Sequence, residues 1–266
     1  MAVKRTRLDA LLVTRGLAES RSQAGALILA GRVRLGDTTP TKAGTPVPEN
    51  ANVSLILPPR FVSRGGEKLD HALTCFALDV AGLVAADLGA STGGFTDCLL
   101  QRGAARVYAV DVGYGELHYR LRQDARVVVM DRTNARYLES LPEPAEIAVM
   151  DLSFISLALV LPAALRVTTP DAAIVALIKP QFEAGRGAVG RGGVVRDPET
   201  HRAVLQSVAN AAGAFGLRLH GLTASPLKGP AGNIEFLGYW RRGEPADAHM
   251  MGAMIAWALD EASKLA

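Results

Sequence analysis

Short apolar runs, each ending at or beside a charged residue, recur along the chain from about residue 83. These runs read LVAADLG, RVYAVDVG, RVVVMDR, IAVMDLS and AAIVALIKP, and segments of helical character separate them. Strands that alternate with helices are typical of a parallel, doubly wound sheet. We therefore expect an α/β domain over residues 83–266.

The charged residues at these strand ends give the first indication of a site: Asp87, Asp111, Asp131, Asp151 and Lys179. In an open α/β sheet the carboxyl ends of the strands line the ligand crevice. For Asp87 we keep the simpler interpretation of a helix N-cap. Lys179, which ends a run of apolar residues, is in isolation best explained as a lysine whose stem packs and whose ammonium reaches water. The set as a whole nevertheless predicts a binding site on one rim.

The segment before residue 59 has a different pattern. RLDALLVTRGLAESRSQAGALILAGRVRLG predicts two short helices, with Gly16 as C-cap of the first and Ser20 as N-cap of the second. Residues 32–35 and 53–57 read as short strands. Their expected apolar faces are Leu8, Leu11 and Leu12, then Ala24, Leu27 and Ile28. We expect a small domain at 1–59, a linker and lead-in helix at 60–82, and the α/β domain at 83–266.

Composition narrows the class of protein. The chain has 266 residues, 49% of them hydrophobic, which is enough for one large core or two smaller domains. Its two cysteines, Cys75 and Cys98, show no metal-ligand spacing and suit a reducing compartment. The N-terminus has no apolar stretch typical of a signal peptide, and uncharged runs such as 152–165 are shorter than the ~18 residues that span a bilayer. We expect a soluble, cytoplasmic protein without a metal site.

Charge is unevenly distributed along the chain. Residues 1–68 hold eleven lysines and arginines against five acids, whereas the remaining residues carry more acids than bases. A basic N-terminal segment followed by a mildly acidic remainder indicates a module that binds a polyanion. A basic surface that is simply solvated explains the charge alone equally well.

The stretch DLGASTGGFTDCLL follows the first strand of the α/β domain. Gly89, Gly93 and Gly94 let the backbone approach a ligand, and Thr96 or Asp97 is expected to start a helix. The spacing matches neither the GxGxxG dinucleotide motif nor the GxxxxGK[ST] phosphate loop. A plain tight turn is the competing interpretation.

Two acids further along favour a nucleoside ligand. Asp111 lies about twenty residues downstream, where an acid accepts hydrogen bonds from ribose hydroxyls, and Asp131 is placed to hold an adenine amino group. A nucleoside cofactor without a polyphosphate fits this pattern better than NAD or ATP.

These motifs resemble the Rossmann-like S-adenosylmethionine methyltransferases, in particular the RNA 2′-O-methyltransferases of the FtsJ/RrmJ type. That branch carries a Lys-Asp-Lys-Glu tetrad, which the resemblance places on Lys68 of SRGGEKL, Asp151 of VMDLSFIS, Lys179 of IKPQFE and Glu235 of GNIEFLG. Glu235 is expected in a late strand that forms an antiparallel hairpin with LRLHGLTAS. The resemblance implies S-adenosylmethionine as cofactor, held by Gly89, Ser91, Gly93, Gly94, Phe95, Asp111, Asp131 and Asp151.

The N-terminal module resembles the S4 RNA-binding domain in RLDALL, RGLAESR, LILAGRVRLG and Lys42-Ala43-Gly44. Together, the two parts resemble the TlyA family of ribosomal RNA (cytidine-2′-O)-methyltransferases, often labelled hemolysins. Ribosomal RNA in ribosomal subunits is the implied partner, with no membrane. Basic residues of such modules contact phosphates. The expected RNA-binding residues are Arg5, Arg7, Arg15, Arg21, Arg32, Arg34, Arg64, Arg186 and Arg191.

The resemblance also gives Lys179 a chemical role. Methyl transfer to a hydroxyl needs alignment and a more nucleophilic oxygen. Lys179 is expected beside the ribose 2′-OH, either deprotonating it or stabilising the developing alkoxide. Asp151 would hold Lys179 and face the methyl donor, while Lys68 and Glu235 would place the ribose. The glycine-rich loop 183–200 is expected to guide phosphates, and the target nucleotide to be flipped out.

Three other functions compete with this one. S4 modules also precede pseudouridine synthases, which need no nucleoside cofactor. A ribosome assembly factor would bind RNA without chemistry. A membrane-active cytolysin is the third, but the sequence has no spanning segment and only 5% aromatic residues. The nucleotide methylated, the subunit used and the oligomeric state are left open.

Overall fold

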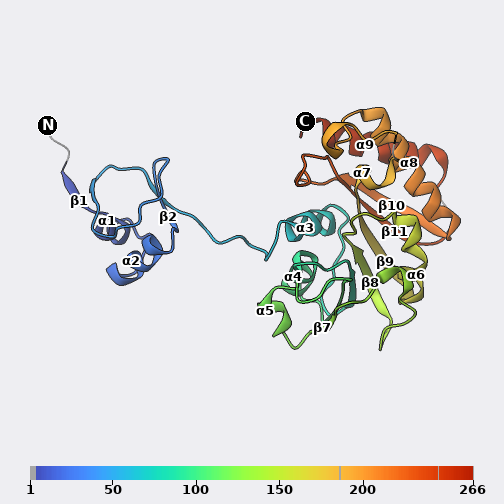
Figure 1. The fold of residues 1–266 in the computed structure, drawn as a ribbon, viewed down its shortest axis with the longest axis horizontal. Helices are drawn as coiled ribbons and strands as arrows, with labels where there is room; N and C mark the ends of the chain where they lie inside the picture. Colours follow the sequence, from blue (N-terminus) through green and yellow to red (C-terminus); the bar gives the residue numbers. More distant parts are fainter. Residues whose placement is uncertain (1–3, 186, 245, 266) are drawn as a thin grey trace. The chain divides into compact units, whose positions relative to one another are not determined.

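The computed structural model describes residues 4–185, 187–244 and 246–265, without the side chain of Arg191. Two compact units make up the chain, Met1–Pro59 and Arg60–Ala266 (Figure 1).

The N-terminal unit combines two helices with two small antiparallel sheets. Its elements are β1 (Arg5–Arg7), α1 (Leu8–Thr14), α2 (Arg21–Leu29), β2 (Val33–Leu35), β3 (Pro46–Pro48) and β4 (Val53–Leu55). Strand β1 pairs with β3, and β2 pairs with β4. The two predicted helices and the strand pair β2–β4 are confirmed, whereas β1 and β3 were not predicted.

Local sequence explains where the two helices begin and end. Gly16 follows α1 with a φ of +68°, a left-handed conformation that glycine adopts without strain. The side chain of Ser20 accepts a hydrogen bond from the backbone N–H of Gln23 and so caps α2. The predicted apolar faces form the small core, where Leu8, Leu12, Ala24 and Ile28 are fully buried and Leu27 packs partly buried against them.

The C-terminal unit is built on one seven-stranded sheet. Its strands are β5 (Val84–Leu88), β6 (Arg106–Val110), β7 (Val127–Met130), β8 (Ala145–Met150), β9 (Thr168–Ile178), β10 (Leu217–Ala224) and β11 (Phe236–Arg242). Its helices are α3 (Gly65–Cys75), α4 (Gly94–Gln101), α5 (Tyr119–Arg122), α6 (Leu161–Arg166), α7 (Pro180–Glu183), α8 (Pro198–Ala214) and α9 (Ala248–Ser263). Short 3₁₀ turns lie at Ala135–Tyr137, Leu157–Leu159 and Arg191–Gly193.

The strand order is β10-β11-β9-β8-β5-β6-β7. Strands β5 to β9 are parallel, and β11 runs antiparallel to both β9 and β10. The five predicted strands and the late antiparallel hairpin are therefore confirmed. Because the five strands are parallel, their carboxyl ends share one edge of the sheet.

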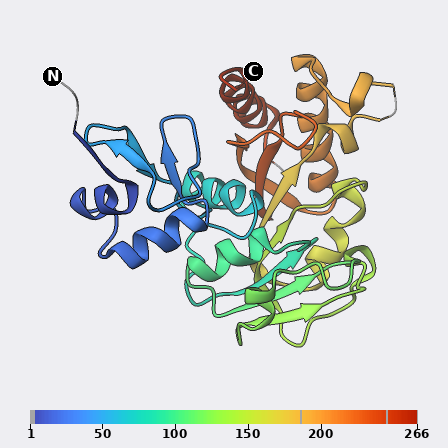
Figure 2. The ribbon, with the colours of Figure 1, turned by 60° about the vertical axis from the view of Figure 1, so that its left-hand side comes forward.

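Helices cover both faces of this sheet (Figure 1). One core joins the sheet to α3, α4 and α5 through Leu69, Leu99 and Leu121. The other joins it to α6, α8 and α9, and includes Val204 and Ile255. Figure 2 shows the same unit from another side, with the strands running through its middle. The predicted fold class, a Rossmann-like α/β domain preceded by a small α+β module, is confirmed.

Candidate active site

Two cavities open at the carboxyl edge of the parallel strands. One, of about 460 Å³, is lined by Gly89, Ser91 and Asp111 from the ends of β5 and β6. The other, of about 760 Å³, is lined by residues of α3, of the turns after β8 and β9, and of the segment before β11. Asp151 and Ser153 line both. The turn after β8 therefore joins the two cavities. We name them the cofactor cavity and the ribose cavity after the roles that the sequence predicts for their residues.

The four residues of the predicted tetrad all line the ribose cavity. Lys68 lies in α3, Asp151 and Lys179 directly follow β8 and β9, and Glu235 directly precedes β11. Glu235 therefore lies one residue outside the strand in which it was expected. Residues 167 positions apart in the sequence meet here because α3 packs beside the end of the antiparallel hairpin.

The tetrad forms two ion pairs of different character. Lys68 Nζ lies 2.5 Å from Glu235 Oε2, and both residues are buried. Lys179 Nζ lies 2.6 Å from Asp151 Oδ1, and both side chains keep some exposure to the cavity. Lys179 also donates a hydrogen bond to Ser153 Oγ over 3.0 Å. The second pair is therefore the more accessible of the two, chiefly through Asp151.

The glycine turn after β5 shapes the cofactor cavity. Gly89 has a φ of +96°, and a Cβ there would lie 3.0 Å from the carbonyl oxygen of Asp151. Asp111 accepts hydrogen bonds from the backbone N–H groups of Ser91 and Gly113, each over 2.7 Å. This carboxylate therefore orders the turn, and it remains on the cavity wall where hydroxyl groups could reach it. Only glycine at position 89 lets the two turns approach so closely.

Three other residues expected at the cofactor take structural positions in the turn. Gly93, at φ +93°, packs against Leu117 and Leu121 and caps α4. Helix α4 therefore begins at Gly94, before the expected Thr96 or Asp97. Gly94 and the buried Phe95 line a small cavity of about 90 Å³ together with Gly89 and Asp151.

Asp131 is engaged by a neighbouring arginine. Both of its carboxylate oxygens accept hydrogen bonds from Arg122 Nη2, at 2.9 and 2.7 Å, and this pairing lowers the pKa of Asp131. Asp131 does not appear on the wall of the cofactor cavity, which Thr133, Asn134 and Arg136 line instead. A role for Asp131 at an adenine group stays a prediction, and Arg122 competes for the same oxygens.

The interpretation of Asp87 as a helix N-cap is wrong. Asp87 lies inside β5, is fully buried, and accepts a hydrogen bond from the hydroxyl of Thr96 over 2.7 Å. Its other oxygen has no hydrogen-bond partner among the described residues. Burial raises the pKa of Asp87 to about 7, the Thr96 hydrogen bond opposes that shift, and the nearby charge of Asp151 adds to it.

This buried carboxyl predicts a specific dependence of stability on pH. Because the pKa of Asp87 is about 7 in the folded protein and its ordinary value is 3.8, the stabilisation it gives is complete below pH 4 and is lost as the pH rises through 7. Asp87→Asn cannot ionise, so it should not lose this stability as the pH rises. The free energy of unfolding of Asp87→Asn, taken relative to that of the wild type, should therefore increase by about 4 kcal/mol between pH 4 and pH 8. Urea unfolding at several pH values measures the difference. The exposed Asp171→Asn serves as control, and a constant offset for Asp87→Asn would contradict the prediction.

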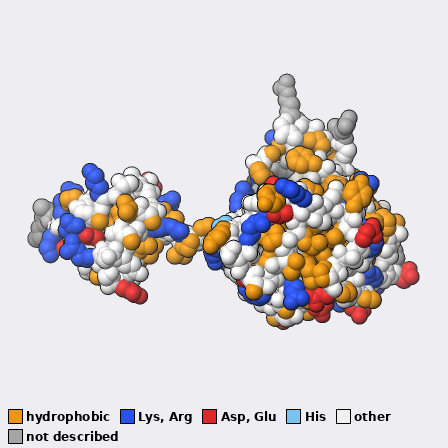
Figure 3. All heavy atoms as spheres, turned by 60° about the horizontal axis from the view of Figure 1, so that its bottom comes forward, with side chains coloured by type: hydrophobic (Ala, Val, Ile, Leu, Met, Phe, Trp, Pro, Cys, Tyr) orange, Lys and Arg blue, Asp and Glu red, His pale blue; other side chains and the backbone are white. Residues whose placement is uncertain are grey.

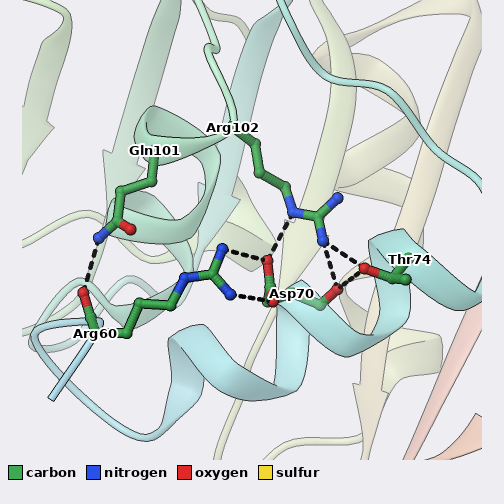
Figure 4. A network of polar contacts seen from close by, with 5 residues as sticks. All are labelled: Arg60, Asp70, Thr74, Gln101 and Arg102. Carbon is green, nitrogen blue, oxygen red and sulfur yellow. Dashed lines mark hydrogen bonds and ion pairs between the residues drawn. The ribbon is translucent and has the colours of Figure 1, made fainter.

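The linker residues Arg60 and Phe61, to which the sequence assigned no role, anchor the start of the unit. Arg60 pairs with Asp70 in α3, which also binds Arg102 from the end of α4 (Figure 4). Gln101 donates to the carbonyl oxygen of Arg60 over 2.9 Å. The ring of Phe61 is buried against Gly66, where a Cβ would lie 2.3 Å from Phe61 Cγ. These contacts fix α3, and with it Lys68.

The predicted RNA-binding arginines of the N-terminal unit are mostly exposed, and Figure 3 shows basic side chains gathered on part of that unit. Several are also held by internal contacts. Arg7 and Arg21 both bind the buried Asp9, whose pKa falls to about 2 chiefly through the hydrogen bond from Arg7. Arg15 donates to the carbonyl oxygens of Glu49 and Ala51, each over 2.6 Å.

The remaining predicted RNA-binding residues are placed as follows. Arg5 donates to the carbonyl oxygen of Pro46, Arg34 is exposed, and Arg32 is half-buried. In the C-terminal unit, Arg64 lines the ribose cavity and donates to the carbonyl oxygen of Lys228. Arg186 and the side chain of Arg191 lie outside the described residues.

Some residues of the site were not found by sequence reasoning. Ser153 and Phe154 line both cavities. Phe154 is 89% exposed, and its ring centroid lies 4.9 Å from that of Phe182, with the two rings tilted by 47°. Asn233 donates to Gly193 and accepts from Val195, which ties the glycine-rich loop to the segment before Glu235. These residues lie within the motifs MDLSFIS and GNIEF. Their closeness in the sequence to the tetrad residues Asp151 and Glu235 could therefore have indicated that they belong to the site.

Among residues 4–185, 187–244 and 246–265, no group of three or more His, Cys, Asp or Glu side chains is arranged to hold a metal ion. In that same part of the chain, none of the helices combines the length and apolar character needed to cross a membrane.

The sheet, its antiparallel hairpin and the glycine turn with an acid after β6 define a Rossmann-like methyltransferase domain. The family model of the FtsJ-like methyltransferases matches residues 61–242, and that of the S4 domain matches residues 6–53. The chain belongs to the TlyA family of FtsJ-like methyltransferases.

Individual relatives agree with this assignment. The chain is 50% identical to the 16S/23S rRNA (cytidine-2′-O)-methyltransferase TlyA of Mycobacterium tuberculosis over 90% of each chain. It is 39% identical to hemolysin A of Brachyspira hyodysenteriae, over 88% of this chain and 99% of that protein. A solved structure from Streptococcus thermophilus, of a protein named as a hemolysin, is 40% identical with a TM-score of 0.74, covering 99% of this chain and 98% of the other.

Proposed function

We propose that this protein transfers a methyl group from S-adenosylmethionine to a ribose 2′-hydroxyl of ribosomal RNA, with cytidine as the target nucleotide. The observation that carries the proposal is the ribose cavity, where four charged side chains form two ion pairs beside the cofactor cavity. The M. tuberculosis relative, named for this reaction on 16S and 23S rRNA, supports the same substrate.

The residues on the cofactor cavity fit a nucleoside. Gly89 leaves room where a Cβ would touch Asp151, and the Asp111 carboxylate on the wall suits ribose hydroxyls. Ser91 and Asp151 would complete the contacts, with Phe95 and Gly94 supporting the turn. When bound, S-adenosylmethionine supplies a methyl group that a nucleophile can displace from positively charged sulfur.

Lys179 acts on the acceptor side. Its amine lies on the ribose cavity, where it can orient the 2′-hydroxyl and either take its proton or stabilise the negative charge that develops on oxygen. Asp151 holds the amine and faces both cavities. Lys68 and Glu235 neutralise each other and shape the opposite wall, which positions the ribose.

The two units have different roles in the proposed reaction. Residues 1–59 bind RNA phosphates through the basic residues that remain exposed around Asp9. Residues 60–82 form the lead-in segment that supplies Lys68, and they carry out transfer together with residues 83–266. Such phosphate contacts give affinity and salt dependence rather than sequence readout. Arg64 lines the ribose cavity, which suits a phosphate next to the target nucleotide. The cytoplasmic location expected from the sequence stays a prediction.

The first experiment uses purified protein, methyl-labelled S-adenosylmethionine and separated small and large ribosomal subunits from cells that lack the enzyme. We expect label at a 2′-O position of cytidine in the RNA of at least one subunit, with the labelled subunit identifying the substrate. Calorimetry measures cofactor binding in parallel. Cofactor binding without labelled RNA from either subunit would overturn the ribosomal substrate. Absence of cofactor binding would overturn methyl transfer and leave an RNA-binding assembly factor.

A further inference from the structure

The hydroxyl of Ser153 makes a contact with Lys179 that the tetrad does not account for. Lys179 Nζ donates a hydrogen bond to Ser153 Oγ over 3.0 Å. Asp151 Oδ1 lies closer, at 2.6 Å, but it receives no hydrogen bond of good geometry. Asp151 therefore supplies the attraction between charges, and Ser153 supplies the contact that depends on direction.

The geometry of an amine makes this distinction important. A lysine amine has three tetrahedral positions that rotate freely about the bond to its last carbon. With one position turned to Ser153 and another drawn to Asp151, the third is left for the ribose cavity, which all three residues line. That third position is the lone pair of a neutral amine or the remaining N–H of an ammonium, so it serves either role of Lys179.

We infer that Ser153 is a positioning residue that orients the Lys179 amine toward the ribose hydroxyl. The inference rests on the proposed function. In the reaction the ribose oxygen bonds to the methyl carbon, the electron pair of the broken carbon–sulfur bond stays on sulfur, and the hydroxyl proton leaves through the Lys179 amine or to water. Holding the amine in the correct orientation toward the ribose hydroxyl raises the rate of transfer but does not raise the affinity for either substrate.

The loop that carries Ser153 is held by other contacts. Ser156 Oγ donates to Glu183 Oε2 over 2.7 Å, and the N–H of Leu157 donates to Glu183 Oε1 over 2.8 Å. The ring of Phe154 contacts that of Phe182 in α7 in a tilted arrangement. Because these contacts tie the loop to the segment after Lys179, removing the hydroxyl of Ser153 should leave the loop in place. Ser156→Ala is the matched control, since it removes a hydroxyl from the same loop without touching Lys179, and the N–H of Leu157 still binds Glu183.

The test compares Ser153→Ala, Ser153→Thr and Ser156→Ala with the wild type in transfer of label from S-adenosylmethionine to the RNA substrate. Ser153→Ala should lower kcat about tenfold, the scale of one hydrogen bond to a charged group, with both KM values within about twofold. Ser153→Thr keeps a hydroxyl and should retain most of the rate. Ser156→Ala should keep kcat near that of the wild type, whatever its effect on thermal stability.

A second readout does not depend on turnover. In ¹⁵N-lysine-labelled protein, the Lys179 amine resonance, assigned by its absence from Lys179→Arg, should be sharp in the wild type and in Ser156→Ala. It should broaden in Ser153→Ala as the amine rotates and exchanges with water. An unchanged resonance and an unchanged kcat in Ser153→Ala would overturn the inference.

The remaining outcomes are also decisive. If Ser153→Ala weakens S-adenosylmethionine binding by calorimetry while kcat at saturation is unchanged, Ser153 belongs to the cofactor cavity and the inference fails. If the wild type itself transfers no label to ribosomal RNA, the proposed function fails. The resonance of Lys179 then still shows whether Ser153 orients the amine.

Discussion

Lys179→Ala is expected to lower the rate of methyl transfer by about 10²–10⁴-fold, the range for losing a positioned acid–base group. Lys179 lines the ribose cavity but not the cofactor cavity, so the affinity for S-adenosylmethionine should stay close to that of the wild type. Single-turnover transfer of label to the ribosomal substrate measures the rate, and calorimetry measures the affinity.

Lys179→Arg separates the two roles left open for this residue. Arginine keeps the positive charge but does not give up its proton in proteins. If Lys179 removes the proton of the 2′-hydroxyl, Lys179→Arg should be about as slow as Lys179→Ala, whereas electrostatic stabilisation should leave part of the rate. Lys228 lines the same cavity and provides the control, since Lys228→Ala should change kcat less than about tenfold. A Lys179→Ala enzyme with near wild-type turnover would remove Lys179 from the mechanism.

The parallel sheet was predictable because each strand carries its own signal in the sequence. Runs such as AAIVALI are buried on both faces and therefore consist of apolar residues without alternation, and a charged residue at the end marks the edge. The same reasoning placed Asp151 and Lys179 on one rim, where they pair. The three-residue strands β1 and β3 were missed because so few residues show no period, and β3 contains two prolines.

What the sequence pattern did not show at the site is which partner each charged side chain binds, even where that partner is close in the sequence. The pattern shows that Asp131 ends a strand, but it does not show that Arg122 will occupy both of its oxygens. Asp87 was assigned to the rim as a cap, although it lies one residue inside β5 and faces Thr96 in the interior. Arg7 and Arg21 stay predicted phosphate ligands, and the pattern did not show that both also bind Asp9. A linear pattern gives the strand and its end, and packing decides which neighbour each charge meets.

The two ion pairs of the tetrad should respond differently to mutation, because only one of them is buried. Lys68 and Glu235 are both almost inaccessible to solvent, so removing one partner leaves an uncompensated buried charge. Lys68→Met or Glu235→Met alone should lower the free energy of unfolding by about 3–5 kcal/mol, and the double variant should recover most of that loss. The exposed i,i+4 pair Lys264–Asp260 gives the comparison, where Lys264→Met should leave the free energy of unfolding close to that of the wild type.

Activity in the double variant then decides what the buried pair contributes beyond stability. If Lys68 and Glu235 place the ribose through their charges, the Lys68→Met/Glu235→Met protein should be folded, bind S-adenosylmethionine and remain at least about 10²-fold slower than the wild type. Urea unfolding and single-turnover transfer on the same preparation measure the two properties. A double variant that regains both stability and rate would show that the pair only holds α3 against the hairpin. In that case the chemistry would rest on Lys179, Asp151 and the loop that carries Ser153.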